Sequence, residues 1–561
     1  MFLVVAGTCF FANYLLSEGF GLYEDDYWLI LPALGWRWSD LLSSLESVVH
    51  QAPQGRPLGH LLNLLLAYAT GTPHSLLPAY LTGWLILSLN GFLVSRLLRP
   101  LLGPFPSLIA ALVYVTYAVD ASKMILMHRA FLHLSTTELL GALWLFQRGW
   151  PVASYVVAVC ALVSYESFYL PFVIAPLLCL ERERRTLSCL GRHVVIVALI
   201  ALCVVAARYL LGEEKATVLA AAGPLQLMRM VTAPWFGAGA ALWALIARPI
   251  DVVLSMSLWL WLTAVFGAGV LWVALGWAEP RLGNAEPDAG PDIAPATTWS
   301  LAFTGLAALA VTYVLAFRPW YYPPITNIGR LSGVHAAGAF GGSLFVAALV
   351  ALGRAHARRM WLKPVCVVWL GLLVAYGVQI QYAEYLTSWA LQRTLWRSVV
   401  HQSLDATDGT IVVLDSSTAA SRTRGFVTVL SAVMNYGVLS QFLGSPAGWR
   451  TPPVLTCNID GYNQAVEVTG DGVVIKCPGW WGQWPTIRSG EFIRFRYANG
   501  AYERVSDDVV IAGHRFTPKP IGPSNPELRT SRVYRLLLET NASDAWFRFG
   551  RTCWEPTTCD R

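Results

Sequence analysis

Charged residues are scarce in this sequence. Asp, Glu, Lys and Arg make up 13% of the 561 residues, 55% are hydrophobic, and the mean hydropathy is +0.50. Soluble domains carry about 25% charged residues. The deficit excludes an ordinary soluble protein and predicts a polytopic α-helical membrane protein. The basic residues are dispersed between apolar segments, so the net charge of +6 indicates membrane topology and no nucleic-acid partner.

Several motifs are also absent. The sequence contains neither a glycine-rich phosphate loop nor the Cys/His spacing of a zinc site. The first apolar segment, Phe2 to Ser17, lacks a basic region before it and a small-residue cleavage site after it. We therefore expect this segment to remain as a membrane span and not to be removed as a signal peptide.

The ten cysteines divide into two groups. Six lie in the apolar two-thirds of the chain, where we expect thiols: Cys9, Cys160, Cys179, Cys189, Cys203 and Cys366. Four lie in the polar C-terminal part: Cys457, Cys477, Cys553 and Cys559. An even number in a polar domain predicts two disulfides and an oxidising, extracytoplasmic location. Proximity in sequence favours the pairs Cys457–Cys477 and Cys553–Cys559.

About eleven apolar segments are candidate transmembrane helices, because about 20 apolar residues cross a bilayer. A further segment, 233–247, is either a twelfth span or a re-entrant piece. The eleven are 2–17, 76–95, 103–119, 131–147, 151–164, 168–180, 193–211, 252–277, 299–317, 333–352 and 362–381.

Positive charge assigns the two sides of the membrane. Arginine clusters fall on alternate connections, which places those connections and the N-terminus in the cytoplasm. The first long loop, 19–75, is then outside, and the stretch 278–298 is a cytoplasmic linker. The sequence thus predicts a multi-pass plasma-membrane domain over 1–381.

The composition changes at about residue 382. Runs of β-branched residues alternate with turn signals such as Asn499-Gly500. They predict a soluble, extracytoplasmic mixed α/β domain over 382–561. Its expected strands are 410–414, 454–457, 466–477, 492–497, 502–505, 509–511 and 533–538.

The acidic stretch Glu24-Asp25-Asp26-Tyr27-Trp28 follows the first span directly. Three carboxylates cannot lie in hydrocarbon without a large cost, so the stretch is placed at the water–membrane boundary. A solvated loop after a helix end is one interpretation and a functional site is the other. The same choice applies to Glu166, which interrupts an apolar run within Ser164-Tyr165-Glu166-Ser167.

Several cationic or basic side chains are expected on the same outer side: Arg56, Lys123, His128, Arg129, Lys215, Arg229, Arg318 and Arg330. A carboxylate beside such groups suits one chemistry. The carboxylate deprotonates an acceptor hydroxyl, while Arg or Lys neutralises a phosphate leaving group. A sugar linked to polyprenyl phosphate is a donor available on that side.

The layout resembles the GT-C superfamily of membrane glycosyltransferases. The resemblance rests on Glu24-Asp25-Asp26-Tyr27-Trp28 after the first span, on Gln54-Gly55-Arg56-Pro57-Leu58, and on the break at Ser164-Tyr165-Glu166. It implies that Asp25 is the catalytic carboxylate, with Asp26 the next choice. It also implies that the lipid phosphate is held by Arg56 together with one or more of Lys123, Arg129 and Arg330. Glu166 departs from relatives that carry Lys there.

The resemblance implies an inverting enzyme, in which a divalent cation, Mg²⁺ or Mn²⁺, is a possible but unassigned cofactor. The acceptor is an extracytoplasmic glycan, lipid or protein, and Glu24 and Glu166 belong to the substrate site. Tyr321, between Arg318 and Arg330, stacks on a sugar or prenyl group or belongs to an aromatic belt.

Two other classes remain open: a transporter or flippase of lipid-linked sugars, and a non-catalytic assembly protein of the cell envelope. No internal repeat of the transporter kind is visible. The enzyme hypothesis requires Asp25 to lie within about 10 Å of an outer-side cation or a cavity.

Overall fold

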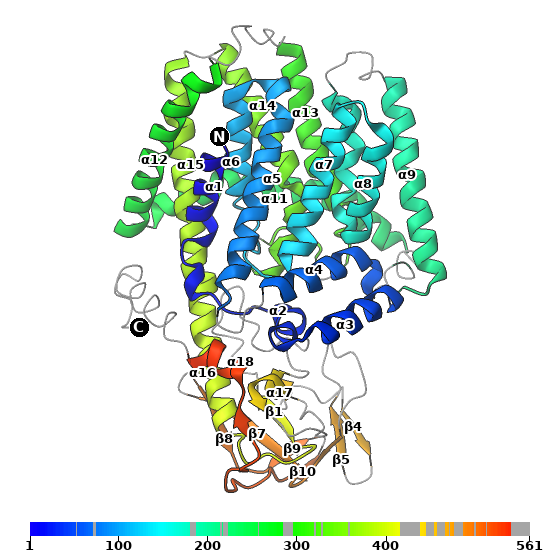
Figure 1. The fold of residues 1–561 in the computed structure, drawn as a ribbon, viewed down its shortest axis with the longest axis vertical. Coiled ribbons are helices and arrows are strands. Elements are labelled where there is room, and N and C mark those ends of the chain that lie inside the picture. Colours follow the sequence, from blue (N-terminus) through cyan, green and yellow to red (C-terminus); the bar gives the residue numbers. More distant parts are fainter. Residues whose placement is uncertain are drawn as a thin grey trace.

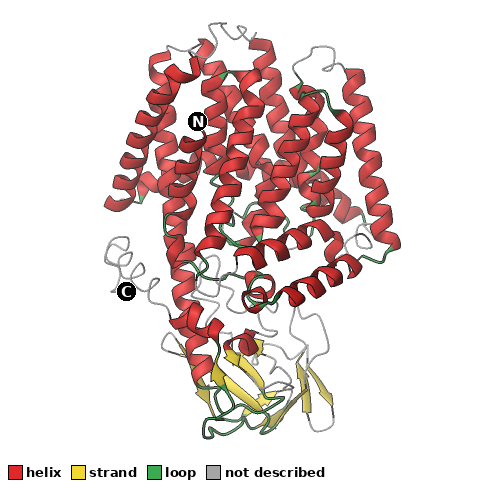
Figure 2. Cartoon of the chain, in the orientation of Figure 1, coloured by secondary structure: helices red, strands yellow, loops and turns green. Residues whose placement is uncertain are grey.

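A helical bundle and a smaller region of strands make up the computed structural model (Figures 1 and 2). The structure describes residues 1–51, 53–70, 75–179, 187–213, 216, 223–255, 257–283, 295–318, 321–326, 329–356, 359–415, 438–444, 454–456, 466–469, 472–475, 486–498, 501–511 and 513–539. The expected helical architecture with a C-terminal region of strands is therefore confirmed.

Eight helical runs in the described ranges are long and apolar enough to cross a membrane, which suits a membrane protein. They are Phe2–Gly19, Leu77–Leu102, Leu187–Leu210, Pro224–Leu254, Leu258–Gly276, Ala296–Leu315, Arg330–Arg354 and Trp361–His401. Shorter apolar helices stand among them, including Pro104–Val115 and Pro151–Ser164. The number of eleven spans, and their sidedness, stay predictions.

The bundle consists of α1 and α5 to α15 (Figure 1). Their bounds are α1 Phe2–Cys9, α5 Leu77–Leu102, α6 Pro104–Val115, α7 Ser135–Gln147, α8 Pro151–Ser164, α9 Leu187–Leu210, α11 Pro224–Leu254, α12 Leu258–Gly283, α13 Pro295–Val311, α14 Ala339–His356 and α15 Arg359–Ile380. Helices α12 and α13 occupy 278–283 and 295–298 of the expected linker. Residues 284–294 of the linker lie outside the described ranges.

The first loop folds into helices at the same end of the bundle as the strands (Figure 1). These are α2 Asp26–Leu29, α3 Trp38–Gln51 and α4 Pro57–Thr70. The loop begins by packing against the last helix of the bundle. A Cβ at Gly21 would overlap the Trp389 ring, so only glycine allows this close approach.

Helix α11 joins two helices at opposite sides of the bundle, α9 and α12 (Figure 1). The end of α9 reaches the first loop, where Arg208 donates to the Gln54 carbonyl. Helix α12 runs antiparallel to α15, since Gly276 lies against Lys363 and Gly267 against Val374. It therefore begins at that same end, so both ends of α11 lie there. Its 31 residues extend about 46 Å across the bundle.

The last helix of the bundle continues beyond it. Helix α15 passes through a π segment, Gln381–Leu386, into α16, Thr387–His401. Residue 382, the expected domain boundary, thus lies inside a continuous helical run of 41 residues. Helix α16 ends against strand β8, where Gln402 donates to the Tyr502 carbonyl.

The strands form a mixed sheet with the order β3-β1-β7-β8 and smaller pairings beside it. Strand β1 pairs in parallel with β3 and β7, and β8 is antiparallel to β7. The strands are β1 Ile411–Asp415, β2 Leu443–Gly444, β3 Val454–Thr456, β4 Val466–Thr469, β5 Gly472–Ile475, β6 Thr486–Arg488, β7 Phe492–Ala498, β8 Ala501–Val505, β9 Val509–Ile511, β10 His514–Phe516 and β11 Arg529–Thr530.

Most expected strands are found, but the strand expected at 533–538 is wrong. Those residues belong to α18, Arg532–Tyr534, and the π segment Arg535–Glu539. Ser531 caps this helix by accepting from the Tyr534 N–H, and the capped turn outweighs the β-branched pattern. Another short helix, α17, spans Val438–Phe442.

The cysteine predictions are only partly testable. The six cysteines of the apolar part are present as thiols. Cys457, Cys477, Cys553 and Cys559 lie outside the described residues, so both disulfides stay predictions.

Candidate functional site at one end of the bundle

The three consecutive carboxylates after α1 have three different sets of partners. The backbone turns at Glu24 with a φ of 47°, a left-handed conformation uncommon outside glycine. Asp25 then precedes the short helix α2, and Asp26 begins it. Although all three side chains are buried, they are not equivalent.

Asp25 forms an ion pair with Arg330. Its Oδ2 lies 2.7 Å from Arg330 Nη2, whereas its Oδ1 is buried and accepts no hydrogen bond from the residues described. Burial raises the pKa of Asp25, and the Arg330 charge opposes that rise. The distance to a cation is well within the limit set by the enzyme hypothesis.

Glu24 shares the same arginine at longer range. Its Oε2 lies 3.9 Å from Arg330 Nε. Burial raises the pKa of Glu24 to about 8, despite the nearby guanidinium. Asp25 is therefore the nearer of the two carboxyl groups to the Arg330 guanidinium.

The side chain of Asp26 is held by backbone N–H groups. Its Oδ2 accepts from the backbone N–H groups of Tyr23 and Leu126, both at 3.2 Å, and its Oδ1 accepts from Met127 at 2.9 Å. Burial raises its pKa to about 7, and these N–H donors limit the rise. Both oxygens are occupied, so Asp26 joins the first loop to residues 126–127 and is poorly placed to act as a base.

A second ion pair connects Arg56 with Glu166. Arg56 donates from Nε and Nη2 to the two carboxylate oxygens, at 2.8 and 2.7 Å. The guanidinium also lies over the Tyr165 ring, 3.6 Å from its centroid. Two segments that the sequence singled out separately, around Arg56 and around Glu166, thus meet.

Tyr321 lies between the two ion pairs. Its electrostatic neighbours are Tyr165, Arg330, Arg56 and Asp25. Burial raises the pKa of its hydroxyl. Four stretches distant in sequence therefore form one polar cluster: the acidic stretch, the Arg56 loop, the break at Glu166, and the segment from Tyr321 to Arg330.

Three other predicted site residues have internal partners. Lys123 donates to the Val115 carbonyl at 3.4 Å, and burial lowers its pKa to about 8. His128 Nδ1 lies 2.8 Å from the Ser122 carbonyl oxygen, and burial lowers its pKa to about 3. Arg129 donates to Leu126 and to Ala79. Lys123, His128 and Arg129 thus bind the backbone around the loop before α7, while Arg129 Nη2 is buried without a partner among the residues described. Their part in a substrate site stays a prediction.

The cations farther along the chain lie at the same end. Arg318 is half-buried, and its carbonyl accepts from the N–H groups of Tyr321 and Tyr322. Arg229, in the first turns of α11, lies over the Tyr322 ring at 5.4 Å. Lys215 lies outside the described residues.

Sequence reasoning missed Glu138 and Tyr165. Ser164 donates to Glu138 Oε1 at 3.1 Å, and Oε2 is buried without a partner among the residues described. The signal was available, because Glu138 is an ionisable residue inside the expected span 131–147. No feature of the sequence around Tyr165 indicated its contact with Arg56, because the two residues are 109 positions apart.

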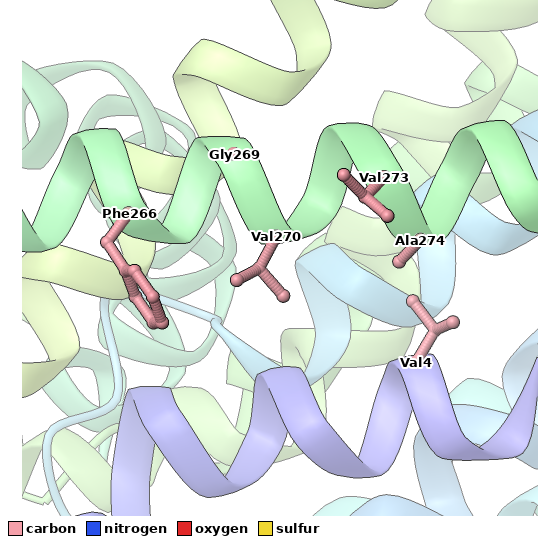
Figure 3. Close-up of a pocket in the computed structure, with 6 residues that line it drawn as sticks. All are labelled: Val4, Phe266, Gly269, Val270, Val273 and Ala274. Carbon is pink, nitrogen blue, oxygen red and sulfur yellow. The ribbon is translucent and has the colours of Figure 1, made fainter.

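An apolar groove opens between α1 and α12 (Figure 3). Its volume is about 640 Å³, and its lining is Val4, Phe266, Gly269, Val270, Val273 and Ala274. These residues are apolar, so the groove suits an acyl chain, and none of these side chains can act as an acid, a base or a nucleophile. Val4 is in the first turn of α1, so the groove lies toward the opposite end of the first span from Asp25.

The described residues offer no cluster of three or more His, Cys, Asp or Glu side chains able to hold a metal ion. Glu24 and Asp25 approach each other but face an arginine. This donor set does not fit the Mg²⁺ or Mn²⁺ that the resemblance left possible.

No protein-family model, curated protein or solved structure matches this chain.

Proposed function

We propose that this protein is a membrane glycosyltransferase of the GT-C type. It moves a sugar from a polyprenyl-phosphate donor to a hydroxyl of a glycan, lipid or protein acceptor outside the cytoplasm. The observation that carries the proposal is Asp25 Oδ1, a buried carboxylate oxygen with no partner in the described chain, beside a cation at the end of the bundle.

The chemistry follows from that arrangement. Asp25 Oδ1 takes the proton of the acceptor hydroxyl, whose oxygen attacks the anomeric carbon of the sugar. The bond from that carbon to the phosphate oxygen breaks, and polyprenyl phosphate leaves. A single displacement inverts the anomeric centre.

Arg56 is the residue proposed for the phosphate side. Two of its donors hold Glu166, and Nη1 is the remaining nitrogen, so an anion can be bound without breaking the ion pair. Tyr165 and Tyr321, between the two ion pairs, supply aromatic surface for the sugar ring.

The test uses the full chain in proteoliposomes with a panel of polyprenyl-phosphate monosaccharides labelled in the sugar. Transfer to cell-envelope glycan and lipid fractions is measured, together with hydrolysis of the donor by water. Asp25→Asn should lower transfer by about 10²- to 10⁴-fold, the usual contribution of a general base. Thermal stability should change little, because Asn keeps the shape of the side chain.

Asp251→Asn is the matched control, since Asp251 pairs with Arg248 at 2.6 Å on α11 and lies outside the cluster. It should keep wild-type transfer. Full transfer by Asp25→Asn, or no transfer by the wild type with any donor, would reject the enzyme. Movement of intact donor across the membrane would then indicate a flippase, and binding of envelope polymers without either activity an assembly protein.

A further inference from the structure

We infer that Arg330 is a positioning residue for Asp25: by holding Oδ2 it presents Oδ1 to the acceptor and keeps the carboxylate ionised. The inference rests on the proposed function. It differs from the sequence-based expectation, which placed Arg330 among the cations that hold the lipid phosphate.

Geometry separates the two roles. Arg330 Nη2 lies 2.7 Å from Asp25 Oδ2, and its Nε faces Glu24 at 3.9 Å, so two of its three nitrogens face the acidic stretch. In a direct displacement the base and the leaving group act on opposite faces of the anomeric carbon. A guanidinium in contact with the base is therefore on the acceptor side, and Arg56 is the better candidate for the phosphate.

The arginine also fixes which oxygen reacts. A carboxylate with two free oxygens can rotate and present either of them. Here one oxygen is bound in a contact of 2.7 Å and the other is buried without a partner among the described residues. The bound oxygen sets the orientation of the free one, which shortens the search for a productive geometry.

The charge of Arg330 has a second effect. Asp25 is nine-tenths buried, and burial by itself disfavours the ionised form that a base needs. The groups that face Asp25 are Glu24 on its own segment, Arg330 from the start of the segment before α14, and Tyr321. Glu24 and Tyr321 add no positive charge, so Arg330 is the group among these that stabilises the carboxylate.

The pH profile of donor turnover tests the inference. Activity should rise with pH as Asp25 loses its proton, which gives an acid limb. Arg330→Gln removes the opposing charge, so the pKa of Asp25 rises and the limb moves to higher pH by at least about one pH unit. At a fixed pH on that limb, turnover should fall about tenfold for each pH unit by which the limb moves, and it should recover as the pH is raised. Arg330→Lys keeps the positive charge, so its acid limb should stay at the wild-type pH.

The KM for the donor separates positioning from phosphate binding. We expect Arg330→Gln to lower kcat on the acid limb and to change the donor KM less than twofold, whereas Arg56→Gln should raise the donor KM. A higher donor KM for Arg330→Gln with an unmoved limb would overturn the inference and leave the proposed function intact.

Two controls protect the interpretation. Arg248→Gln breaks a similar Arg–Asp contact of 2.6 Å on α11 and should leave the limb in place. The profile is repeated in a Glu24→Gln background, because Glu24 faces the same arginine and burial raises its pKa to about 8. If the acid limb moves only when Glu24 is present, the effect belongs to Glu24 and the role of Arg330 is rejected.

If Arg330→Gln does not fold, Arg330→Lys provides the test. Lysine keeps the charge but has a shorter reach, so the limb should stay at the wild-type pH while kcat falls. An unchanged kcat would then reject positioning.

Discussion

Three adjacent carboxylates receive different roles from their surroundings. Asp25 faces an arginine and keeps one oxygen unbound, Asp26 accepts three backbone N–H groups, and Glu24 is buried with a distant cation. Residue type and sequence position do not separate them. The distinction arises because two of the three donors to Asp26, and the partner of Asp25, come from segments about 100 and 300 positions away.

Glu24 gives a stability prediction. Its pKa rises from 4.5 to about 8 on folding, so between these values the folded state holds one more proton than the unfolded state. Stability should therefore fall as the pH rises through this interval. Glu24→Gln removes the effect, so its melting temperature relative to wild type should be higher at pH 8 than at pH 5, by roughly a few degrees. Differential scanning fluorimetry in detergent measures this, and a difference that does not vary with pH would contradict it.

Sequence reasoning identified Asp25, Arg56, Glu166, Tyr321 and Arg330 as candidates, and the structure brings them together. It could not identify which of them touch. An ion pair between Arg56 and Glu166 depends on how α4 packs beside the end of α8, and no local pattern encodes that packing. Lys123, His128 and Arg129 were chosen for their charge, and in the buried loop each of them binds a backbone carbonyl, which no local pattern shows.

At the scale of elements, α11 is the clearest case in which composition does not determine how a helix is oriented. Its length and hydropathy equal those of a span, so the sequence left 233–247 as a twelfth span or a re-entrant piece. Because both ends of this 31-residue helix lie at one end of the bundle, we propose a third arrangement, in which it lies along the membrane boundary. Its outward residues include Val231, Trp235 and Ile250, so an apolar face remains exposed along much of its length. Such a face suits the plane of the membrane boundary.

Depth measurements test this orientation. Cysteines introduced at Val231 and Ile250, with Cys203 replaced, are labelled with a fluorophore and quenched by shallow and deep nitroxide lipids. The two positions are about 28 Å apart along the axis, yet they should report the same depth. Val195 and Leu210 on α9 are the matched pair, and they should differ by about 22 Å. Different depths at Val231 and Ile250 would show that α11 crosses the membrane.

At the scale of the molecule, the strands are fixed to the bundle by a buried ion pair below α16. Arg504 Nη1 lies 2.6 Å from Asp405 Oδ1, and the two side chains are 2% and 5% exposed. Arg504 also donates to the carbonyls of Gln402 and Lys519. This one side chain thus ties the end of the long helix to β8 and to the segment after β10.

Loss of that arginine should loosen the connection. Arg504→Met leaves Asp405 buried without its partner, a change that costs on the order of 3–5 kcal/mol. Limited proteolysis should then cut between residues 402 and 411 faster than in wild type. Arg496→Met is the control, because Arg496 is 48% exposed and its Asp507 contact is 4.0 Å long. Equal cleavage rates in all three proteins would contradict the assigned role.

The sequence was informative about class and organisation. Low charge and long apolar segments predicted the helical part, and β-branched runs located most of the described strands. The continuous helix through residue 382 was not foreseen, because a change in composition marks a change in environment and a helix can pass through both. The strand expected at 533–538 failed for a related reason: a capping serine set the local conformation.

A continuous helical run from Trp361 to His401 connects the bundle to the strands. The number of residues in this helix therefore sets how the strands are oriented relative to the bundle. Each residue of an α-helix advances the chain by about 1.5 Å and turns it by about 100°. One alanine inserted after Thr394 would therefore turn the sheet by more than a quarter of a circle relative to Asp25, and seven would raise it by about 10 Å with nearly the original facing. The length of the helix therefore fixes both the rotation of the strands and their distance from the bundle. An acceptor bound by the strands would therefore reach the Asp25 carboxylate only at one combination of rotation and distance.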